Sequence, residues 1–500
     1  MSTPHSVLLV LLVLVPFAAV LVGLVLGGRN AERLVLATVA IGLLLALAVA
    51  AALMRSHEAL VYVLGGWQPP LGVALRADGL SAVMLVAVAV VMAGIAVYAR
   101  ASFGTKTGEG ERRSALTFWL LLLSIWGALN LVFVAGDVFT LYVALELLTF
   151  AAVPLVCLDG TGDTLRAALR YLLFALVGSM LYLLGAFLLY GGYGALDIPV
   201  LAMRVKPEPI AWSAAALMTA GLLAKTALFP LHLWLPPAHA GAPAAASAVL
   251  SALVVKGSWF LLLRLWIDVF PDVVTLAAAQ LLAALGATAI VLGNLTALRQ
   301  VRLKLLIAYS TVAQIGYLFL MFPLVAGLRS SPIDASTAVT GGMLQTISHA
   351  TAKAAMFMAA GLVYTTLGHD RLTELRGVGR ALPMTTVAFA LAGASLIGLP
   401  PSGGFLAKWL LLSASFASTQ WWWACVMLVG GLLTSVYVFT FVVRALAPAE
   451  AGWTPKSRVP AYQQHAVLAL ALCSFVLGAA AWLPGDLMRI GAPTPAGAAR

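Results

Sequence analysis

The 500-residue sequence predicts an all-α polytopic membrane protein with about 14 transmembrane helices. Three observations predict this fold class. Hydrophobic residue types make up 62% of the chain and charged types only 9%, whereas soluble proteins carry about 25% charged residues. Apolar runs of about 20 residues, the length that crosses a bilayer, recur along the whole chain. Two of these runs are interrupted by proline-rich segments at related positions, which indicates an internal repeat.

The apolar runs define the helices in chain order. The first run, Val7 to Leu26, has no basic residue ahead of it and is long enough to span a bilayer. We therefore expect it to remain as a helix rather than be cleaved as a signal peptide. The fourteen predicted spans are residues 6–27, 35–54, 78–99, 115–135, 138–158, 165–191, 210–230, 243–266, 273–293, 303–324, 336–366, 383–418 (interrupted), 421–445 and 464–484.

The distribution of basic residues predicts the topology. An even number of spans places both termini on one side of the membrane. Loops on that side carry eight Lys and Arg, with Arg264 counted among them, whereas the opposite loops and helix ends carry seventeen. Because basic loops stay in the cytoplasm, both termini are expected on the outer, periplasmic side of the cell (inner) membrane. The net charge of +11 is thereby explained without a nucleic-acid partner.

The proline breaks divide the chain. Residues 228–237 interrupt the seventh span and residues 399–404 interrupt the twelfth. Proline frees a backbone carbonyl that lipid cannot satisfy but a hydrated cavity can. Breaks five helices apart predict two inverted five-helix repeats, helices 4–8 and 9–13. The predicted divisions are 1–112 (helices 1–3), 113–268 (first repeat), 269–446 (second repeat) and 447–500 (helix 14).

Several function classes lack support in the sequence. Cys157, Cys425 and Cys473 lie far apart, without the spacing of a metal or iron–sulfur site or of a disulfide framework. Neither a phosphate-binding loop nor a dinucleotide-binding glycine motif is present. We therefore expect no cofactor, no metal and no redox or nucleotide chemistry within this chain.

Five charged residues fall inside predicted spans, and they are the candidate functional residues: Glu146, Lys225, Lys256, Lys353 and Lys408. Each costs about 2.5–3.5 kcal/mol in the bilayer centre, and packing does not require them. Glu146 and Lys225 can form a buried ion pair between helices 5 and 7. That pair is either structural or a proton-transfer pair. Burial disfavours the charged form of both groups, which suits proton transfer.

The remaining intramembrane polar groups admit two interpretations each. Lys256, near Ser247, Ser251 and Ser258, either snorkels to the interface or joins a polar path. His349 and Lys353 share a helix face and are either packing residues or a relay.

Lys408, seven residues after Pro401, either caps a half-helix or ends a path at bulk solvent. His232 and His239 flank the first break and are expected to line hydrated backbone, because ligand pairs on a helix need a spacing of three or four.

Several of these segments resemble a known family. Residues 136–146, 224–236, 305–310, 349–361 and 398–409 are similar to the motifs of the antiporter-like membrane subunits of Mrp-type Na⁺/H⁺ antiporters, respiratory complex I and membrane-bound hydrogenases. The resemblance covers most of the chain. It implies that Glu146 is a coupling acid, Lys225 a switching lysine, Lys256 a connecting lysine and Lys408 an exit lysine. Gln314 departs from the pattern, because many relatives have histidine at that position.

Residues 65–72, the lysine on helix 12 and an end after helix 14 resemble the D subunit of Mrp antiporters. The resemblance implies a proton-translocating subunit of a multisubunit cation/proton antiporter, with other membrane subunits, protons and a monovalent cation as partners. Two alternatives remain: a pump module of a complex I or hydrogenase type redox complex, and an energy-coupling subunit for inorganic-carbon uptake. A scaffold with relic charges is disfavoured by the cost of those charges.

The charge bias gives a topology prediction. Reporter fusions at Gly108 and Pro207 should report cytoplasmic and external locations respectively, because the two sites follow an odd and an even number of spans. Enzymatic reporters active on one side of the membrane only provide the measurement. Finding both sites on the same side would contradict the predicted topology.

Overall fold

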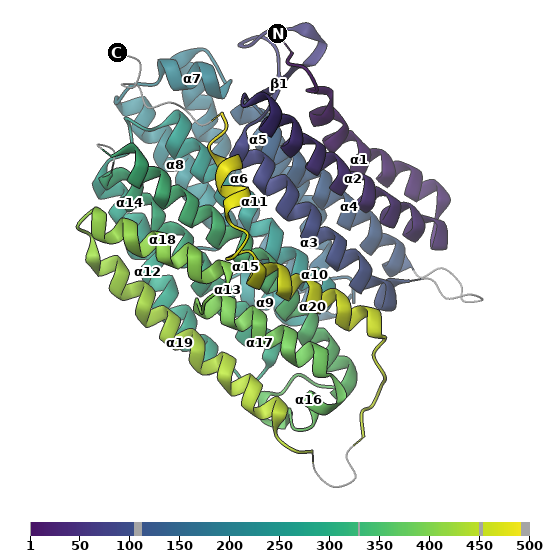
Figure 1. Ribbon diagram of the computed structural model, residues 1–500. Coiled ribbons are helices and arrows are strands. Elements are labelled where there is room, and N and C mark those ends of the chain that lie inside the picture. The colour runs from purple at the N-terminus through teal and green to yellow at the C-terminus, as the bar shows by residue number, and fades with distance from the viewer. Residues whose placement is uncertain (1, 105–112, 329–330, 450–453, 492–500) are drawn as a thin grey trace.

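The computed structural model describes residues 2–104, 113–328, 331–449 and 454–491, so Gly108 lies outside the described residues. The fold is an all-helical polytopic membrane bundle, as predicted (Figure 1). Ten described helices are long and apolar enough to cross a membrane, and α17, α18 and α20 are shorter apolar helices. The helices are α1 (Val7–Leu26), α2 (Gly28–Ser56), α3 (Gly79–Phe103), α4 (Arg113–Val134), α5 (Val138–Val156), α6 (Gly162–Tyr193), α7 (Ile198–Arg204), α8 (Pro209–Thr226), α9 (Leu235–Gly241), α10 (Ala244–Val249), α11 (Val255–Arg264), α12 (Leu276–Leu298), α13 (Leu303–Phe319), α14 (Met321–Gly327), α15 (Pro332–Leu367), α16 (Val378–Ala381), α17 (Pro383–Ile397), α18 (Gly403–Ala417), α19 (Trp421–Leu446), α20 (Ala461–Val476) and α21 (Trp482–Met488).

Both ends of the described chain lie at the same face of the bundle (Figure 1). A short antiparallel sheet of β1 (Leu60–Val63) and β2 (Ala74–Ala77) marks this face. The Thr3 amide donates to the Val61 carbonyl (2.8 Å), and the Gly79 amide at the start of α3 donates to the Ile490 carbonyl (2.8 Å). The described ends of the chain therefore lie at one face, which agrees with the predicted placement of both termini on one side. Which compartment this face meets remains a prediction.

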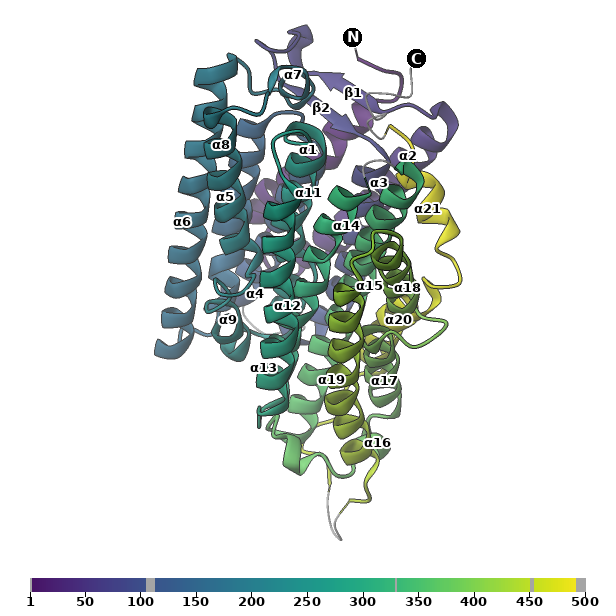
Figure 2. The ribbon, with the colours of Figure 1, turned by 90° about the vertical axis from the view of Figure 1, so that its left-hand side faces the viewer.

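The two proline breaks are present where the sequence places them. Helix α8 ends at Thr226 and α9 begins at Leu235, whereas α17 ends at Ile397 and α18 begins at Gly403. Ala227 and Gly398 adopt left-handed backbone conformations at the two helix ends, with φ of 59° and 93°. Helix α8 runs away from the termini's face and α17 runs toward it, as an inverted repeat requires (Figure 2).

The central helix is α15, which the sequence predicts as the eleventh span. It packs against α10 of the first predicted repeat, against α13, α17 and α18 of the second, and against α3 and α20. Helix α6 packs closely against α8, and α12 against α13. Gln345, His349 and Lys353 in the middle of α15 are therefore enclosed by helices from both repeats.

Three predicted spans differ in detail. The eighth span contains two π-helical segments, η2 (Leu250–Val254) and η3 (Leu265–Val269), on either side of α11. The tenth divides at Leu320 into α13 and α14, just before the helix-breaking Pro323. The predicted span 464–484 is two helices, α20 and α21. Between them Gly478 packs against the carbonyls of Pro401 and Ser402, where a Cβ atom would not fit.

Candidate functional site

Glu146 on α5 and Lys225 on α8 meet in the interior of the first predicted repeat. Lys225 Nζ lies 3.5 Å from Glu146 Oε1, and the two side chains are only 6% and 15% exposed. The ammonium group also contacts Thr149 Oγ1 (2.8 Å). On its other side Glu146 accepts a hydrogen bond from Ser179 of α6. The sequence prediction that these two residues lie within ion-pair reach agrees with this geometry.

Small residues on α6 and α8 bring Lys225 to this position. A Cβ atom on Gly178 would lie 2.6 Å from the Gly221 carbonyl oxygen and 3.2 Å from Lys225 Cγ. Only glycines allow this approach, which follows the small-residue rule for membrane helix packing.

The first helix break lies directly after this segment of α8. Trp234 Nε1 donates to the Ala224 carbonyl (3.0 Å), and the Trp234 ring stacks on Tyr171. The Trp234 indole therefore supplies a donor to a backbone carbonyl that would be paired with a backbone amide in an intact helix.

Lys256 lies fully inside the bundle, at the start of α11 and directly after the π-helical segment η2. Its ammonium group donates to the carbonyl of Ser251. Ser251 Oγ in turn contacts Thr311 Oγ1 of α13 at 2.9 Å. Further along α11, Ser258 Oγ accepts from Thr226, the neighbour of Lys225, at 3.0 Å. One pair of hydroxyl groups thus links α8 to α11, and another links the Ser251 beside Lys256 to α13.

His349 and Lys353 on α15 are also buried, and both face α13. Lys353 Nζ donates to the Ile307 carbonyl (3.1 Å) and to Ser310 Oγ. Two turns earlier on α15, Gln345 donates to Gln314 Oε1 (3.0 Å). His349 lies one turn from each of these contacts, and neither of its ring nitrogens has a hydrogen-bond partner among the described residues.

Lys408, which follows Lys225, Lys256 and Lys353 in the sequence, lies at the second break. Its Nζ donates to the carbonyls of Leu396 (2.6 Å) and Ile397 (3.0 Å), and it lies 4.4 Å from the centroid of the Tyr317 ring. The Leu396 carbonyl also accepts from Gln314 (3.4 Å). Lys408 is only 7% exposed, so in this structure the second break does not open it to bulk solvent. The capping contact that the sequence offered as the alternative is present.

Helix α13 touches all three of these lysine sites. Ser310 binds Lys353, Thr311 binds Ser251 beside Lys256, and Gln314 shares the Leu396 carbonyl with Lys408. Their joint role is not apparent from the sequence. The sequence feature that could have indicated this role is a group of three polar residues, at positions i, i+1 and i+4, within an apolar span. No carboxylate forms an ion pair with Lys256, Lys353 or Lys408 in the part of the chain that the structure describes.

The two histidines at the first break occupy different environments. His239 is buried in α9 and stacks on Phe357 of α15, with ring centroids 4.6 Å apart. His232 is half-buried in the break itself and stacks on Phe229 at 5.5 Å. Only His239 therefore approaches the helix that carries His349 and Lys353.

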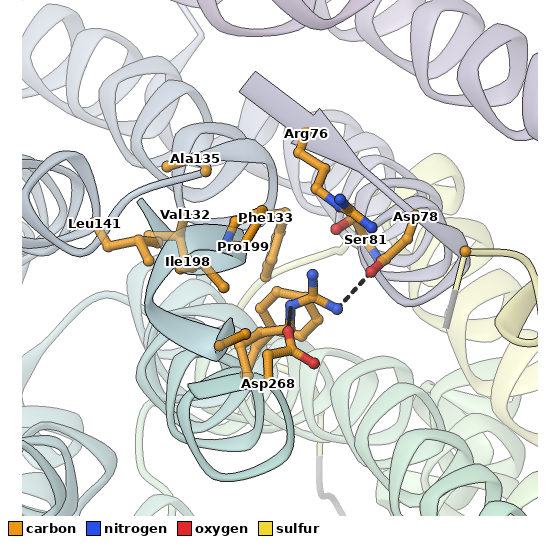
Figure 3. A pocket seen from close by; sticks show the side chains of 15 residues that line it. Arg76, Asp78, Ser81, Val132, Phe133, Ala135, Leu141, Ile198, Pro199 and Asp268 are labelled. Carbon is orange, nitrogen blue, oxygen red and sulfur yellow. Dashed lines mark hydrogen bonds and ion pairs between the residues drawn. The ribbon is translucent and has the colours of Figure 1, made fainter. Parts of the chain in front are cut away.

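A charged cluster at the termini's face is not among the sites that the sequence predicts. Arg264, counted from the sequence as a loop residue, lies within the bundle at the end of α11 and pairs with Asp78 and with Asp268 (3.0 Å to the latter). Asp78 also caps α3 through the Ser81 amide (3.0 Å). These groups line a cavity of about 190 Å³ with apolar walls from Val132, Phe133 and Ile198. Figure 3 shows Asp78 and Asp268 beside these apolar side chains. The i,i+4 spacing of Arg264 and Asp268 was the available signal.

Comparison with known proteins decides the family. The sequence profile described as NADH:quinone oxidoreductase/Mrp antiporter, TM, matches residues 135–434. The N subunit of the NADH-quinone oxidoreductase of Desulforudis audaxviator is 34% identical over 87% of each chain. The chain belongs to this family of antiporter-like membrane subunits. The matched region holds Glu146 and all four buried lysines.

Relatives from both branches of the family match this antiporter-like chain along most of its length. The D subunit of the Na(+)/H(+) antiporter of Alkalihalophilus pseudofirmus is 29% identical over 87% of each chain. In fold, the protein is similar to a chain of the Mrp complex from a Dietzia species, with a TM-score of 0.86 at 22% identity and coverage of 98% and 97%. It is also similar to a chain of respiratory complex I from Thermus thermophilus, with a TM-score of 0.74 at 26% identity and coverage of 97% and 100%.

The close contact of α6 and α8 at Gly178 and Gly221 gives a prediction about the site. Gly221→Val should push α8 away from α6 and separate Lys225 from Glu146, because its side chain would meet the backbone of Gly178 and Tyr182. We expect a loss of about 1–3 kcal/mol of stability, measured by thermal unfolding in nanodiscs, together with impaired transport.

Gly191→Val, also on a helix of this pair, is the matched control, because a Cβ atom at Gly191 meets nothing within 4 Å. Equal thermal stability of the two variants would contradict the role of the close crossing.

Proposed function

We propose that this antiporter-like protein translocates protons through a buried relay of Glu146, Lys225, Lys256, His349, Lys353 and Lys408, as part of an Mrp-type cation/proton antiporter. The observation that carries the proposal is one buried carboxylate–lysine pair followed by three buried lysines whose partners are neutral. His232 and His239 at the first break are secondary members. The proposal assigns the protein other membrane subunits as partners and a monovalent cation as the coupled ion.

The chemistry follows from the partners of each group. Glu146 stabilises a proton on Lys225 while the pair is closed, and separation of the pair releases that proton to the next group. Thr226 and Ser258 offer hydroxyls between Lys225 and the helix of Lys256. Beyond Lys256, carbonyl and hydroxyl acceptors receive the ammonium groups, and no counter-ion among the described residues holds a proton in place. Such a series of groups favours passing a proton from one group to the next over holding it at one of them.

A stability role explains these residues poorly. An intramembrane charge costs about 2.5–3.5 kcal/mol on insertion. Buried ion pairs can often be replaced by apolar residues without loss of stability. Structural packing therefore gives no reason to keep four lysines inside the bundle, whereas proton transfer requires titratable groups at close intervals.

A second candidate function has its own support. The relative from an NADH-quinone oxidoreductase shares 34% identity with this chain, against 29% for the relative from the Alkalihalophilus antiporter. The same relay would then serve as a pump module in a redox complex whose electron carriers lie in other subunits. Purification of the native assembly through a tagged chain separates the two. Small membrane subunits with Na⁺-driven proton flux support the antiporter, and co-purifying flavin or iron–sulfur subunits support the redox complex.

Lys225→Ala should reduce proton flux at least about a hundredfold, because positioned proton-transfer groups contribute about 10²–10⁴ in rate. Flux is measured in inverted vesicles with a pH-sensitive dye, and assembly is checked on native gels. Lys206→Ala, an exposed lysine at the termini's face, is the control and should transport normally. Wild-type flux in the Lys225→Ala assembly would remove this lysine from the mechanism.

Variants of Lys408 distinguish a relay from a helix cap. Lys408→Arg retains donors for the Leu396 and Ile397 carbonyls but holds its proton too tightly to release it. Lys408→Glu reverses the local charge, removes the lysine as a proton carrier and, while ionised, has no donor for either carbonyl. We expect both variants to lose flux, with the larger loss in Lys408→Glu.

The same vesicle assay measures both Lys408 variants, with assembly checked on native gels. A Lys408→Arg or Lys408→Ala assembly that transports at the wild-type rate would leave only the capping role.

A further inference from the structure

A cavity of about 690 Å³ opens at the face opposite the termini. It lies between the start of α6, the loop that joins α9 to α10, the start of α13 and the ends of α3 and α15. This volume is within the range of small-molecule sites in proteins. Four basic side chains line it, Arg166, Arg170, Arg302 and Lys304, against two acidic ones, Asp159 and Asp163. The cavity is therefore suited to an anion.

Two of the basic groups are fixed by the protein. Arg302 Nε pairs with Asp370 Oδ1 at 3.0 Å, and its Nη2 contacts the Ala240 carbonyl at 3.4 Å. Lys304 Nζ donates to the Ala242 carbonyl at 2.7 Å. Lys304 Nζ lies at the wall of the cavity, and among the described residues it forms no ion pair with a carboxylate. These contacts hold one wall in place.

The other two basic groups are available to a ligand. Arg166 pairs with Asp163 at 3.3 Å, but both side chains are exposed, at 84% and 95%. Exposed ion pairs of this kind contribute little to the stability of a protein. Arg170 forms no hydrogen bond or ion pair through its side chain with any other described residue. Both arginines are exposed and line the cavity.

An apolar stripe on α6 starts at these arginines. Its exposed side chains are Leu165, Leu169, Leu173, Val177, Met180, Leu184 and Phe187. Their spacing places them on one face of the helix together with Arg166. The stripe extends for about 33 Å at the rise of an α-helix, close to the thickness of the hydrocarbon core. Figure 2 shows α6 at the edge of the bundle, with no other described helix of this chain outside it.

We propose that this cavity and the α6 stripe together bind one anionic glycerophospholipid. Its phosphate lies against Arg166 and Arg170 and faces the fixed charges of Arg302 and Lys304, and an acyl chain runs along the stripe. Basic pockets beside transmembrane helices are suited to such headgroups. A free phosphate would use the charges but not the apolar stripe, which is why the site is assigned to a lipid. The proposal does not depend on the transported ion.

The test uses the full-length chain in its native assembly, transferred into nanodiscs. One set contains phosphatidylcholine alone and the other contains phosphatidylcholine with cardiolipin or phosphatidylglycerol. Tightly retained lipid is counted by mass spectrometry for wild type and for the double variant Arg166→Gln/Arg170→Gln. Removing two basic residues should weaken anionic-lipid retention about thirtyfold, at about 1 kcal/mol for each charge near the membrane surface. Phosphatidylcholine retention should not change.

The matched control is Arg376→Gln/Arg380→Gln, which removes two exposed charges from the same face outside the cavity. It should retain anionic lipid as the wild type does. Equal retention in both double variants would overturn the proposal. Displacement of the lipid by millimolar inorganic phosphate alone would reassign the cavity to a free anion. Loss of another protein component from the Arg166→Gln/Arg170→Gln assembly, with lipid unchanged, would reassign it to a protein interface.

Discussion

Backbone carbonyls at two helix breaks impose the constraint on which the interior depends. Within a bilayer, a carbonyl that loses its helical partner must find another donor in the protein. At the first break Trp234 donates to Ala224, and at the second Lys408 donates to Leu396 and Ile397. One of the two donors is apolar apart from its N–H group and the other is titratable. The same backbone requirement is thus met by an indole at the first break and by a lysine at the second, so it does not by itself explain why a titratable group is used there.

Polar groups of α13 and α15 contact one another because these two helices run antiparallel through the centre. Helix α15 presents Gln345, His349 and Lys353 at successive turns, and α13 presents Gln314 and Ser310 opposite them. The only ion pair among the buried candidate residues is that of Glu146 and Lys225, within the described chain. One carboxylate at one end and neutral acceptors along the rest make the arrangement directional. That asymmetry is what a relay coupled to one opening and closing pair requires.

The two faces of the bundle use charge differently. At the termini's face Arg264 lies between Asp78 and Asp268, and these pairs tie α11 to α3 and to its own π-helical extension. At the opposite face Arg166 and Arg170 border an open cavity with weak or no ion pairs among the described residues. Paired charges hold helices in register, whereas unpaired ones remain available to partners. At the opposite face the Arg302–Asp370 pair also fixes the structure, and Arg166 and Arg170 are the exposed charges that remain for the proposed lipid.

The sequence by itself determined the membrane class, the approximate positions of the spans, both proline breaks and five of the charged residues inside the bundle, which are Glu146, Lys225, Lys256, Lys353 and Lys408. These follow from hydropathy, helix rise and proline geometry, which are local properties of the chain. The tertiary structure alone decided that α13 links three lysine sites, that Gln314 connects α15 to the second break, that Lys408 is enclosed and that Arg264 belongs to the interior. Each of these depends on which helix faces meet. Asp78 and Arg264 are 186 residues apart, and no local pattern specifies a contact over such a separation, because it is set by the packing of all the helices between them.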